Sequence, residues 1–179
     1  MWRCPFRPFG SGPEDVPAAL PVALIPLLAL APVLIAAGWS DLTRLRISNR
    51  LCLLAVLVFL ATLPVTGPAD ALWRLIPAVI CFAIGVALFA GGIVGGGDVK
   101  FLPAVLLAVP QGTVSLFLLE FSAALLLSVF AVETIRRLPA PATAGFRFVQ
   151  EARSLPMGLA IAAAGLMHPV FLHALATAL

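Results

Sequence analysis

Two aspartates, Asp41 and Asp98, are the residues of this sequence best placed to do chemistry. Asp98 ends a run of three glycines in the segment GGGDVK, residues 95–100, between two long apolar stretches. A carboxylate at or inside a membrane boundary costs roughly 2.5 to 3.5 kcal/mol on insertion scales, so it is rarely kept without a use. Asp41 falls near the expected C-terminal end of a helix, where the helix dipole disfavours an anion. Each aspartate also has a purely structural interpretation. Asp98 could be the N-cap of a helix, and Asp41 could be a solvated loop residue paired with Arg44.

Two carboxylates in one site can hydrolyse an amide. The ionised one takes a proton from water, while the protonated one polarises the carbonyl and then protonates the leaving nitrogen. Holding them close together favours this division, because like charges cannot both ionise easily and one pKa is raised. The glycine break would admit water and an extended peptide. The sequence therefore suggests a catalytic pair, provided that the two side chains meet.

The composition places this pair in a membrane protein. The 179 residues are 62% hydrophobic and only 11% charged, so the charged residues must lie mostly in short connections. We expect one all-α unit embedded in a lipid bilayer. The net charge of +3 gives no reason to expect nucleic acid as a partner. Residues 1–17 are predicted to form a Pro-rich N-terminal tail, and residues 18–179 the membrane domain.

Charge-free intervals predict about six transmembrane helices with the Gly-rich break before the fourth. The intervals are 16–40, 51–69, 75–97, 101–119, 121–132 and 154–179. The turn signal PQG at 110–112 divides the fourth region into a short helix, about 99–109, and a longer one, about 113–135. Asp70 and Arg74 are expected in an external loop, and the stripe Ala83, Ala87 and Gly91 is expected to pack closely on another helix.

The basic residues predict the orientation. Eight lie on the side of the two aspartates and three on the other. By the positive-inside rule the first side is cytoplasmic and both termini are outside. The first group comprises Arg44, Arg46, Arg50, Lys100, Arg136, Arg137, Arg147 and Arg153, and the second Arg3, Arg7 and Arg74.

The remaining polar residues are predicted to be structural. Glu120 is expected to bond to Ser115, Ser122 or the backbone, or to reach the outer interface, with a proton pathway as the alternative. His168 and His173 are five residues apart and do not share a helix face well, so no metal is expected. The three cysteines have no CxxC spacing, which argues against a metal site or a disulfide framework. No cofactor is expected.

Several segments together resemble a known family. Asp41 with Ile47 and Asn49, followed by GGGDVKF at 95–101, resembles the paired motifs of the prepilin peptidases, which are GxGD-type membrane aspartic endopeptidases of type IV pilus systems. The segment LPMGLAIA at 155–162 is similar to that family's Pro-aromatic-Gly segment. The resemblance covers about residues 22–170. The short chain is similar to the small peptidases of tight-adherence (Flp) pilus systems, which lack the N-methylating region.

The resemblance implies that Asp41 and Asp98 are the catalytic aspartates. Its substrates would be prepilins and pseudopilins, cut at the cytoplasmic face of the bacterial inner membrane, commonly after a glycine and just before a hydrophobic segment. Ser48 stands where the family usually has Pro, and Met157 where an aromatic is usual, which puts local loop geometry and substrate fit in question. Motif support or substrate binding is implied for Asn49, Gly95, Gly97, Lys100, Pro156 and Gly158.

Three other functions compete with this one. An intramembrane GxGD protease of the presenilin kind would cut within an apolar span of its substrate. A small proton-coupled transporter would use Asp41, Asp98 and Glu120 as relay groups beside a broken helix, although no convincing inverted repeat supports it. A purely structural subunit would leave Asp98 without a role.

Overall fold

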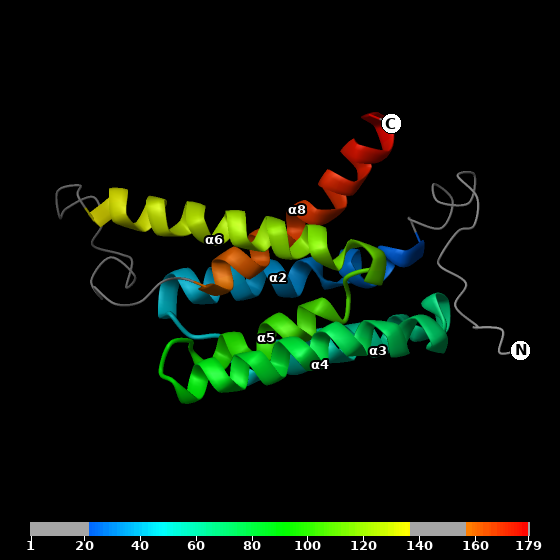
Figure 1. Cartoon of the computed structure of the whole chain (residues 1–179), viewed down its shortest axis with the longest axis horizontal. Coiled ribbons are helices and arrows are strands. Elements are labelled where there is room, and N and C mark those ends of the chain that lie inside the picture. Colours follow the sequence, from blue (N-terminus) through cyan, green and yellow to red (C-terminus); the bar gives the residue numbers. More distant parts are fainter. Residues whose placement is uncertain (1–21, 137–156, 179) are drawn as a thin grey trace, which may run out of the picture.

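The protein is a bundle of helices (Figure 1). A computed structural model describes residues 22–136 and 157–178, and no strand occurs among them. The predicted all-α fold is confirmed. The elements are α2 (Ile25–Arg44), α3 (Asn49–Thr66), α4 (Pro68–Ala90), α5 (Gly96–Leu106), the 3-10 turn η1 (Gln111–Thr113), α6 (Val114–Arg136) and α8 (Met157–Ala178).

Five of the described helices are long and apolar enough to cross a membrane, namely α2, α3, α4, α6 and α8. The chain is therefore a multi-pass membrane protein. The remaining helix, α5, has 11 residues. At 1.5 Å per residue it is about 16 Å long, roughly half of a 30 Å hydrocarbon core. It is the short fourth helix of the prediction, but it begins about three residues earlier, inside the glycine run.

The predicted break in the chain lies between α4 and α5. Gly92 has φ +68°, a left-handed conformation that glycine adopts without steric cost. Gly95, with extended backbone, precedes the first turn of α5. The chain thereby turns back, and α5 packs along α4. The two helices approach closely at Gly85, where an added Cβ would lie 3.1 Å from Val99 Cγ1.

The face of α4 that makes this contact is not the predicted one. Ala83, Ala87 and Gly91 are exposed, so the expected packing of that stripe is wrong. The packed face instead carries Ala78, which is buried, and Gly85. Small residues occur on two faces of α4, and the face with Gly85 is the one that contacts Val99.

The bundle has two sides, which meet where α2 packs against α3 and where α5 packs against α8. Helix α2 packs against α3 and α8, and α8 also packs against α6. On the other side, α3 and α4 both pack against α5. Helix α8 bends along its length (Figure 1), as expected of a helix that contains a proline, here Pro169. The buried core joins the two sides through residues such as Leu30, Leu34, Phe101, Val105 and Ile161.

Arg74 is a fully buried hub at one end of the bundle. The expected external loop is wrong, because Asp70 and Arg74 both lie within α4. Arg74 Nε donates to Asp70 Oδ2 at 2.7 Å, and its two terminal nitrogens donate to the carbonyl oxygens of Ala108 at 2.8 Å and Ala23 at 3.0 Å. Ala23 precedes α2, and Ala108 follows α5. One guanidinium group therefore holds the ends of three helices together, in the paired state in which charged residues are tolerated within membranes.

Replacing Arg74 with Met should destabilise the protein by about 3 to 5 kcal/mol, because it leaves a carboxylate and two carbonyls without their buried donor. The measurement is the free energy of unfolding in detergent micelles. The matched control is Arg50→Met, which removes an exposed arginine from the first turn of α3 and should change stability little. Equal effects of the two substitutions would contradict the buried hub.

Candidate functional site

Three helix ends meet at the end of the bundle opposite Arg74. Asp41 lies in the last turn of α2, Asp98 in the first turn of α5, and Gly158 and Leu159 in the first turn of α8. Helix α8 packs against both α2 and α5. In Figure 1 the starts of α5 and α8 lie at the same side of the view as the end of α2. The two aspartates, far apart in sequence, are thus brought to one end of the fold.

Asp41 is enclosed by the start of α8. It is only 5% exposed, and the backbone N–H of Leu159 donates to Asp41 Oδ2 at 3.1 Å. The first turn of a helix has free N–H groups and the positive end of the helix dipole, so it favours an anion. The dipole of α8 thereby offsets the unfavourable position of Asp41 at the end of α2. Asp41 is therefore not a solvated loop residue, which was its structural interpretation in the sequence analysis.

Gly158 allows this close approach. A Cβ added there would lie 3.0 Å from both Cγ and Oδ2 of Asp41, and 2.7 Å from Ile47 Cδ1. The 3.0 Å contacts with Asp41 are tighter than nine in ten real Cβ contacts, and the 2.7 Å contact would require the end of the Ile47 side chain to move. The glycine that the sequence analysis named as motif support therefore permits the close fit of α8 against the end of α2.

Asp98 lies at the start of α5, outside the five membrane-spanning helices, and is partly buried. Burial, together with the nearby negative charge of Asp41, raises the pKa of Asp98 to about 7. Asp98 Oδ2 lies over Gly95, where an added Cβ would be 3.0 Å from it. The two aspartates are therefore close enough to influence each other's ionisation, as two carboxylates of one site must be.

Ile47 separates the starts of α5 and α8. It is buried in the connection between α2 and α3. A Cβ added at Gly97 would lie 3.2 Å from both Cβ and the carbonyl oxygen of Ile47. The side chain of Ile47 also reaches Gly158, as described above. One isoleucine thus sets the spacing between the helix that carries Asp98 and the helix that holds Asp41.

Two other candidate residues are brought together, and one lies outside the described residues. Lys100 Nζ donates to Asn49 Oδ1 at 3.4 Å, which links α5 to the start of α3 at an exposed position. Cys52 Sγ lies 4.0 Å from the carbonyl oxygen of Gly97, in the same region. Pro156 falls outside the described residues.

Glu120 has a partner that the sequence analysis did not name. Its Oε2 lies 2.9 Å from Nδ1 of the fully buried His168, and His168 Nε2 lies 2.9 Å from Thr113 Oγ1. The expectation of a serine or backbone partner is therefore wrong. The cluster lies where α6, α8 and η1 meet, and the rings of Phe117 and His168 pack in a T-shaped arrangement. Within residues 22–136 and 157–178, no three His, Cys, Asp or Glu residues are grouped to hold a metal ion.

Sequence reasoning missed the role of Leu159. A backbone N–H has no residue-type signature, so no motif could identify it as the donor to Asp41. The available signal was indirect: Pro156 marks a helix start, and a helix start provides free N–H groups. Joining that signal to a distant carboxylate requires the fold.

The fold and the site together define a class: multi-pass all-α membrane proteins with two interacting carboxylates at one end of the bundle. The sequence model of the type IV leader peptidase family matches residues 28–132. This range is more than half of the chain and includes both aspartates. The chain belongs to the type IV leader peptidase family, which makes it a peptidase. The search of curated proteins gave no significant match, and neither did the search of solved structures.

Gly158→Ala should impair the protein, because the new Cβ would push Asp41 and Ile47 out of place. Overpacking of this kind costs about 1 to 3 kcal/mol. We expect a lower melting temperature in detergent together with slower peptide cleavage. The matched control is Gly112→Ala, since an added Cβ there meets nothing within 4 Å. If the two variants behave alike, the close fit of α8 on Asp41 is wrong.

Proposed function

We propose that this protein is an aspartic endopeptidase that cleaves the leader peptides of prepilins and pseudopilins. The observation that carries the proposal is the pairing of a buried Asp41 with a partly buried Asp98 whose pKa lies near 7. The family match supports leader peptidase activity, and it covers both residues. The pairing of the two aspartates supports the aspartic class of peptidase. A carboxyl group that holds its proton near neutral pH can act as a general acid beside an ionised partner.

The proposed mechanism uses one water molecule and no cofactor. Asp41, ionised, takes a proton from water as its oxygen attacks the carbonyl carbon of the scissile peptide. Asp98, protonated, donates a hydrogen bond to the carbonyl oxygen and stabilises the tetrahedral intermediate. The C–N bond then breaks, and the leaving nitrogen takes up a proton from the pair. One water is consumed, and the products are a carboxylic acid and an amine.

The contacts of the two acids favour this assignment of roles. The N–H of Leu159 donates to Asp41, and a hydrogen bond to an ionised acceptor is roughly twice as strong as one to a neutral acceptor. This contact favours the carboxylate form of Asp41 over that of its partner. Asp98 has no such donor among the described residues, so it is the better holder of the shared proton. Like any strongly coupled pair, the two titrate together.

The charge distribution supports cleavage at the cytoplasmic face. Arg44, Arg46, Arg50 and Lys100 all lie in the helix ends and the connection around the two aspartates. The positive-inside rule favours the cytoplasm for this end, and the resemblance supports the bacterial inner membrane as the location of the protein. A prepilin would present its leader there, with its apolar segment in the bilayer.

Asp41→Asn and Asp98→Asn should each lower the rate of prepilin processing by about 10²- to 10⁴-fold, because each removes one member of the acid–base pair. The measurement is co-expression with a candidate prepilin, read as a mobility shift on a gel. The N-terminus of the product should lie just before the apolar segment. A cut within that segment would point instead to an intramembrane protease of the presenilin kind.

The matched control is Glu120→Gln, which neutralises another enclosed acid at a separate cluster. It should leave processing nearly unchanged. Each variant must also reach the membrane at the wild-type level. Full processing by either aspartate variant would refute the proposal, and proton uptake in vesicles that vanished on Glu120→Gln would favour a proton-coupled transporter.

The rate should also fall as the pH rises through about 7, because Asp98 must hold its proton to act as the acid and its pKa is about 7. Above that pH we expect kcat/KM to fall about tenfold per pH unit. Initial cleavage rates in detergent measure this, with the melting temperature followed over the same range to exclude unfolding. A rate that rises through pH 7 would reverse the two roles.

A further inference from the structure

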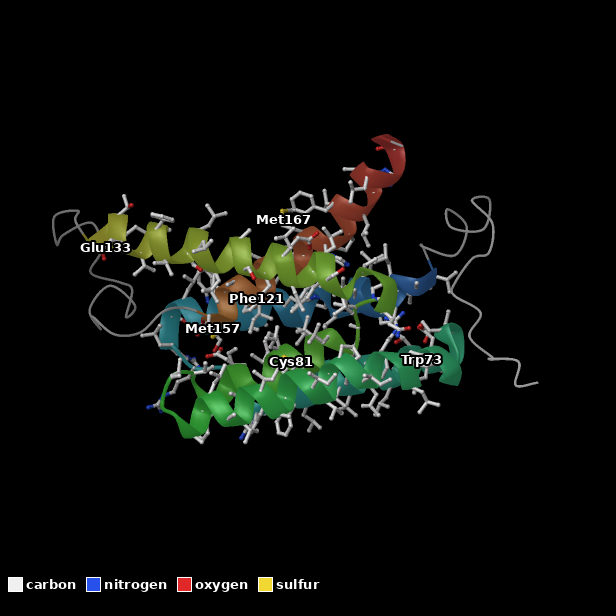
Figure 2. The ribbon with its side chains drawn as sticks, in the orientation of Figure 1. Trp73, Cys81, Phe121, Glu133, Met157 and Met167 are labelled. Carbon is white, nitrogen blue, oxygen red and sulfur yellow. The ribbon has the colours of Figure 1, made fainter. Side chains whose placement is uncertain are left out.

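The connection between α2 and α3, residues 45–48, joins the end of α2 to the start of α5. Helix α2 packs mainly on α3 and α8, and α5 mainly on α3, α4 and α8, so the two acid-bearing helices do not rest chiefly on each other. Figure 2 labels Met157 at the start of α8, and the end of α2 lies next to it. The spacing of Asp41 and Asp98 therefore depends on the groups that link these helix ends, which are the start of α8 and this connection.

A continuous chain of contacts runs from α2 through the connection to α5. Ser40 Oγ, one residue before the first aspartate, donates to the carbonyl oxygen of Arg46 at 3.0 Å. The next residue, Ile47, is buried against Gly97, where an added Cβ would lie 3.2 Å from both Cβ and the carbonyl oxygen of Ile47. Gly97 immediately precedes the second aspartate. The hydroxyl group of Ser40 thus begins a path that starts beside one aspartate and ends beside the other.

Leu45 holds the connection in an unusual backbone conformation. Its φ is +52°, in the left-handed region that residues with a Cβ rarely adopt. Its N–H donates to the carbonyl oxygen of Asp41 at 2.9 Å and so ends α2. The turn made at Leu45 brings the carbonyl group of Arg46 back to Ser40. A strained residue beside a pair of carboxylates suggests that the path of this connection matters to the site.

The contacts of this connection must resist a repulsion that depends on pH. When Asp98 is protonated, the pair carries one negative charge, and when Asp98 is ionised it carries two. Burial and the charge of Asp41 raise the pKa of Asp98 to about 7, so the second charge appears as the pH rises through that value. Like charges in a partly buried site repel each other. Ionisation of Asp98 therefore favours separation of the two helix ends, and protonation favours their closure.

No buried cation cancels this repulsion among the described residues. Asp41 is the charged group that acts on the pKa of Asp98. Of the helices packed on α5, α3 brings the thiol of Cys52 to this end, α4 carries its two charged residues Asp70 and Arg74 at the far end, and α8 carries two histidines well beyond its first turn. The cations around the pair are exposed, so that water and salt screen them. They are Arg44, Arg46, Arg50 and Lys100.

We propose that Ser40 is a positioning residue, whose hydrogen bond to Arg46 holds the end of α2 and the start of α5 together against the repulsion of the two aspartates. Ser40 acts through Ile47 and touches no reacting atom. The inference rests on the proposed function, and it adds to that function a residue that sets the upper pH limit of cleavage.

The first experiment measures kcat/KM for prepilin cleavage by Ser40→Ala, from well below pH 7 to well above it. Loss of one hydrogen bond should weaken closure about 3- to 10-fold, which by linkage lowers the midpoint of the alkaline limb by about 0.5 to 1 pH unit. The loss of rate should therefore be small below the limb and reach about 3- to 10-fold above it. A substitution that only reduced the amount of folded protein would lower the rate equally at every pH.

Two variants at the same end of α2 serve as controls. Ser40→Thr keeps a hydroxyl group and should keep the wild-type midpoint. Thr43→Val removes a hydroxyl group that donates to the carbonyl oxygen of Trp39 at 2.8 Å, within α2 itself, and should also keep the midpoint. An unchanged midpoint in Ser40→Ala, or an equal shift in Thr43→Val, overturns the proposal.

A matched pair of substitutions at Leu45 tests the connection without touching Ser40. Asn tolerates a left-handed backbone and Val does not, although both shorten the side chain to a similar size. Leu45→Val should lower the midpoint of the alkaline limb as Ser40→Ala does, whereas Leu45→Asn should keep it nearer the wild-type value. Equal midpoints in the two variants would contradict a role for the path of the connection.

The last experiment reads the geometry without any cleavage. Cys52 is only 8% exposed, and its Sγ lies 4.0 Å from the carbonyl oxygen of Gly97, so separation of α5 from the connection should uncover it. The protein carries Cys4→Ser and Cys81→Ala, which leaves Cys52 as its only thiol. At one pH above the midpoint, Ser40→Ala should speed alkylation of Cys52 by a maleimide about 3- to 10-fold, and Thr43→Val should not.

The outcomes separate the two levels of inference. If wild-type protein cleaves prepilins, but Ser40→Ala changes neither the midpoint nor the alkylation rate, only this proposal fails. Faster alkylation with an unmoved midpoint would make the contact of Ser40 merely structural and would also overturn it. If Ser40→Ala speeds alkylation but folded, inserted wild-type protein cleaves no prepilin, the contacts of the connection stand and the proposed function fails.

Discussion

The contact between the Asp41 carboxylate and the first turn of α8 is the constraint on which the rest of the site depends. A buried carboxylate without a donor is costly, and the N–H of Leu159 provides one. This contact requires α8 to begin directly against the end of α2, which Gly158 permits and Ile47 limits. Ile47 in turn sets the place of Gly97 and so of the start of α5. The position of Asp98 therefore follows from how Asp41 is enclosed.

The other end of the bundle is held by a second polar contact. Arg74 binds the carbonyl oxygens of Ala23, before α2, and Ala108, after α5. These two helices carry Asp41 and Asp98 at their opposite ends, so both acid-bearing helices are fixed at both ends. Both helices contain an internal proline, Pro32 in α2 and Pro103 in α5, so they are not stiff rods that carry a constraint from one end to the other. The buried arginine anchors the end of each acid-bearing helix that lies opposite the site.

The sequence was sufficient for features that depend on residue type and spacing. Hydropathy located the membrane helices, and the glycine run located the break before Asp98. It was insufficient where a contact joins distant segments. Arg74 was assigned to a loop because hydropathy counts its charge and cannot see Asp70 and two carbonyls around it. Glu120 was given nearby partners, whereas His168 lies 48 residues away in sequence.

Helix α5 is about half as long as a membrane-spanning helix, and this short length explains how one fold can give two aspartates different surroundings. A full spanning helix that began in the glycine run would continue the apolar bundle, but α5 ends after 11 residues and is packed between α3, α4 and α8. Its first turn therefore lies at the rim of the bundle, where Asp98 stays partly exposed beside the enclosed Asp41. Unequal burial and unequal hydrogen bonding separate the two carboxylates, and such a separation lets one carry a proton while the other does not. In the proposed mechanism the glycine break and the short helix contribute to the chemistry, because they leave Asp98 partly exposed at the start of α5.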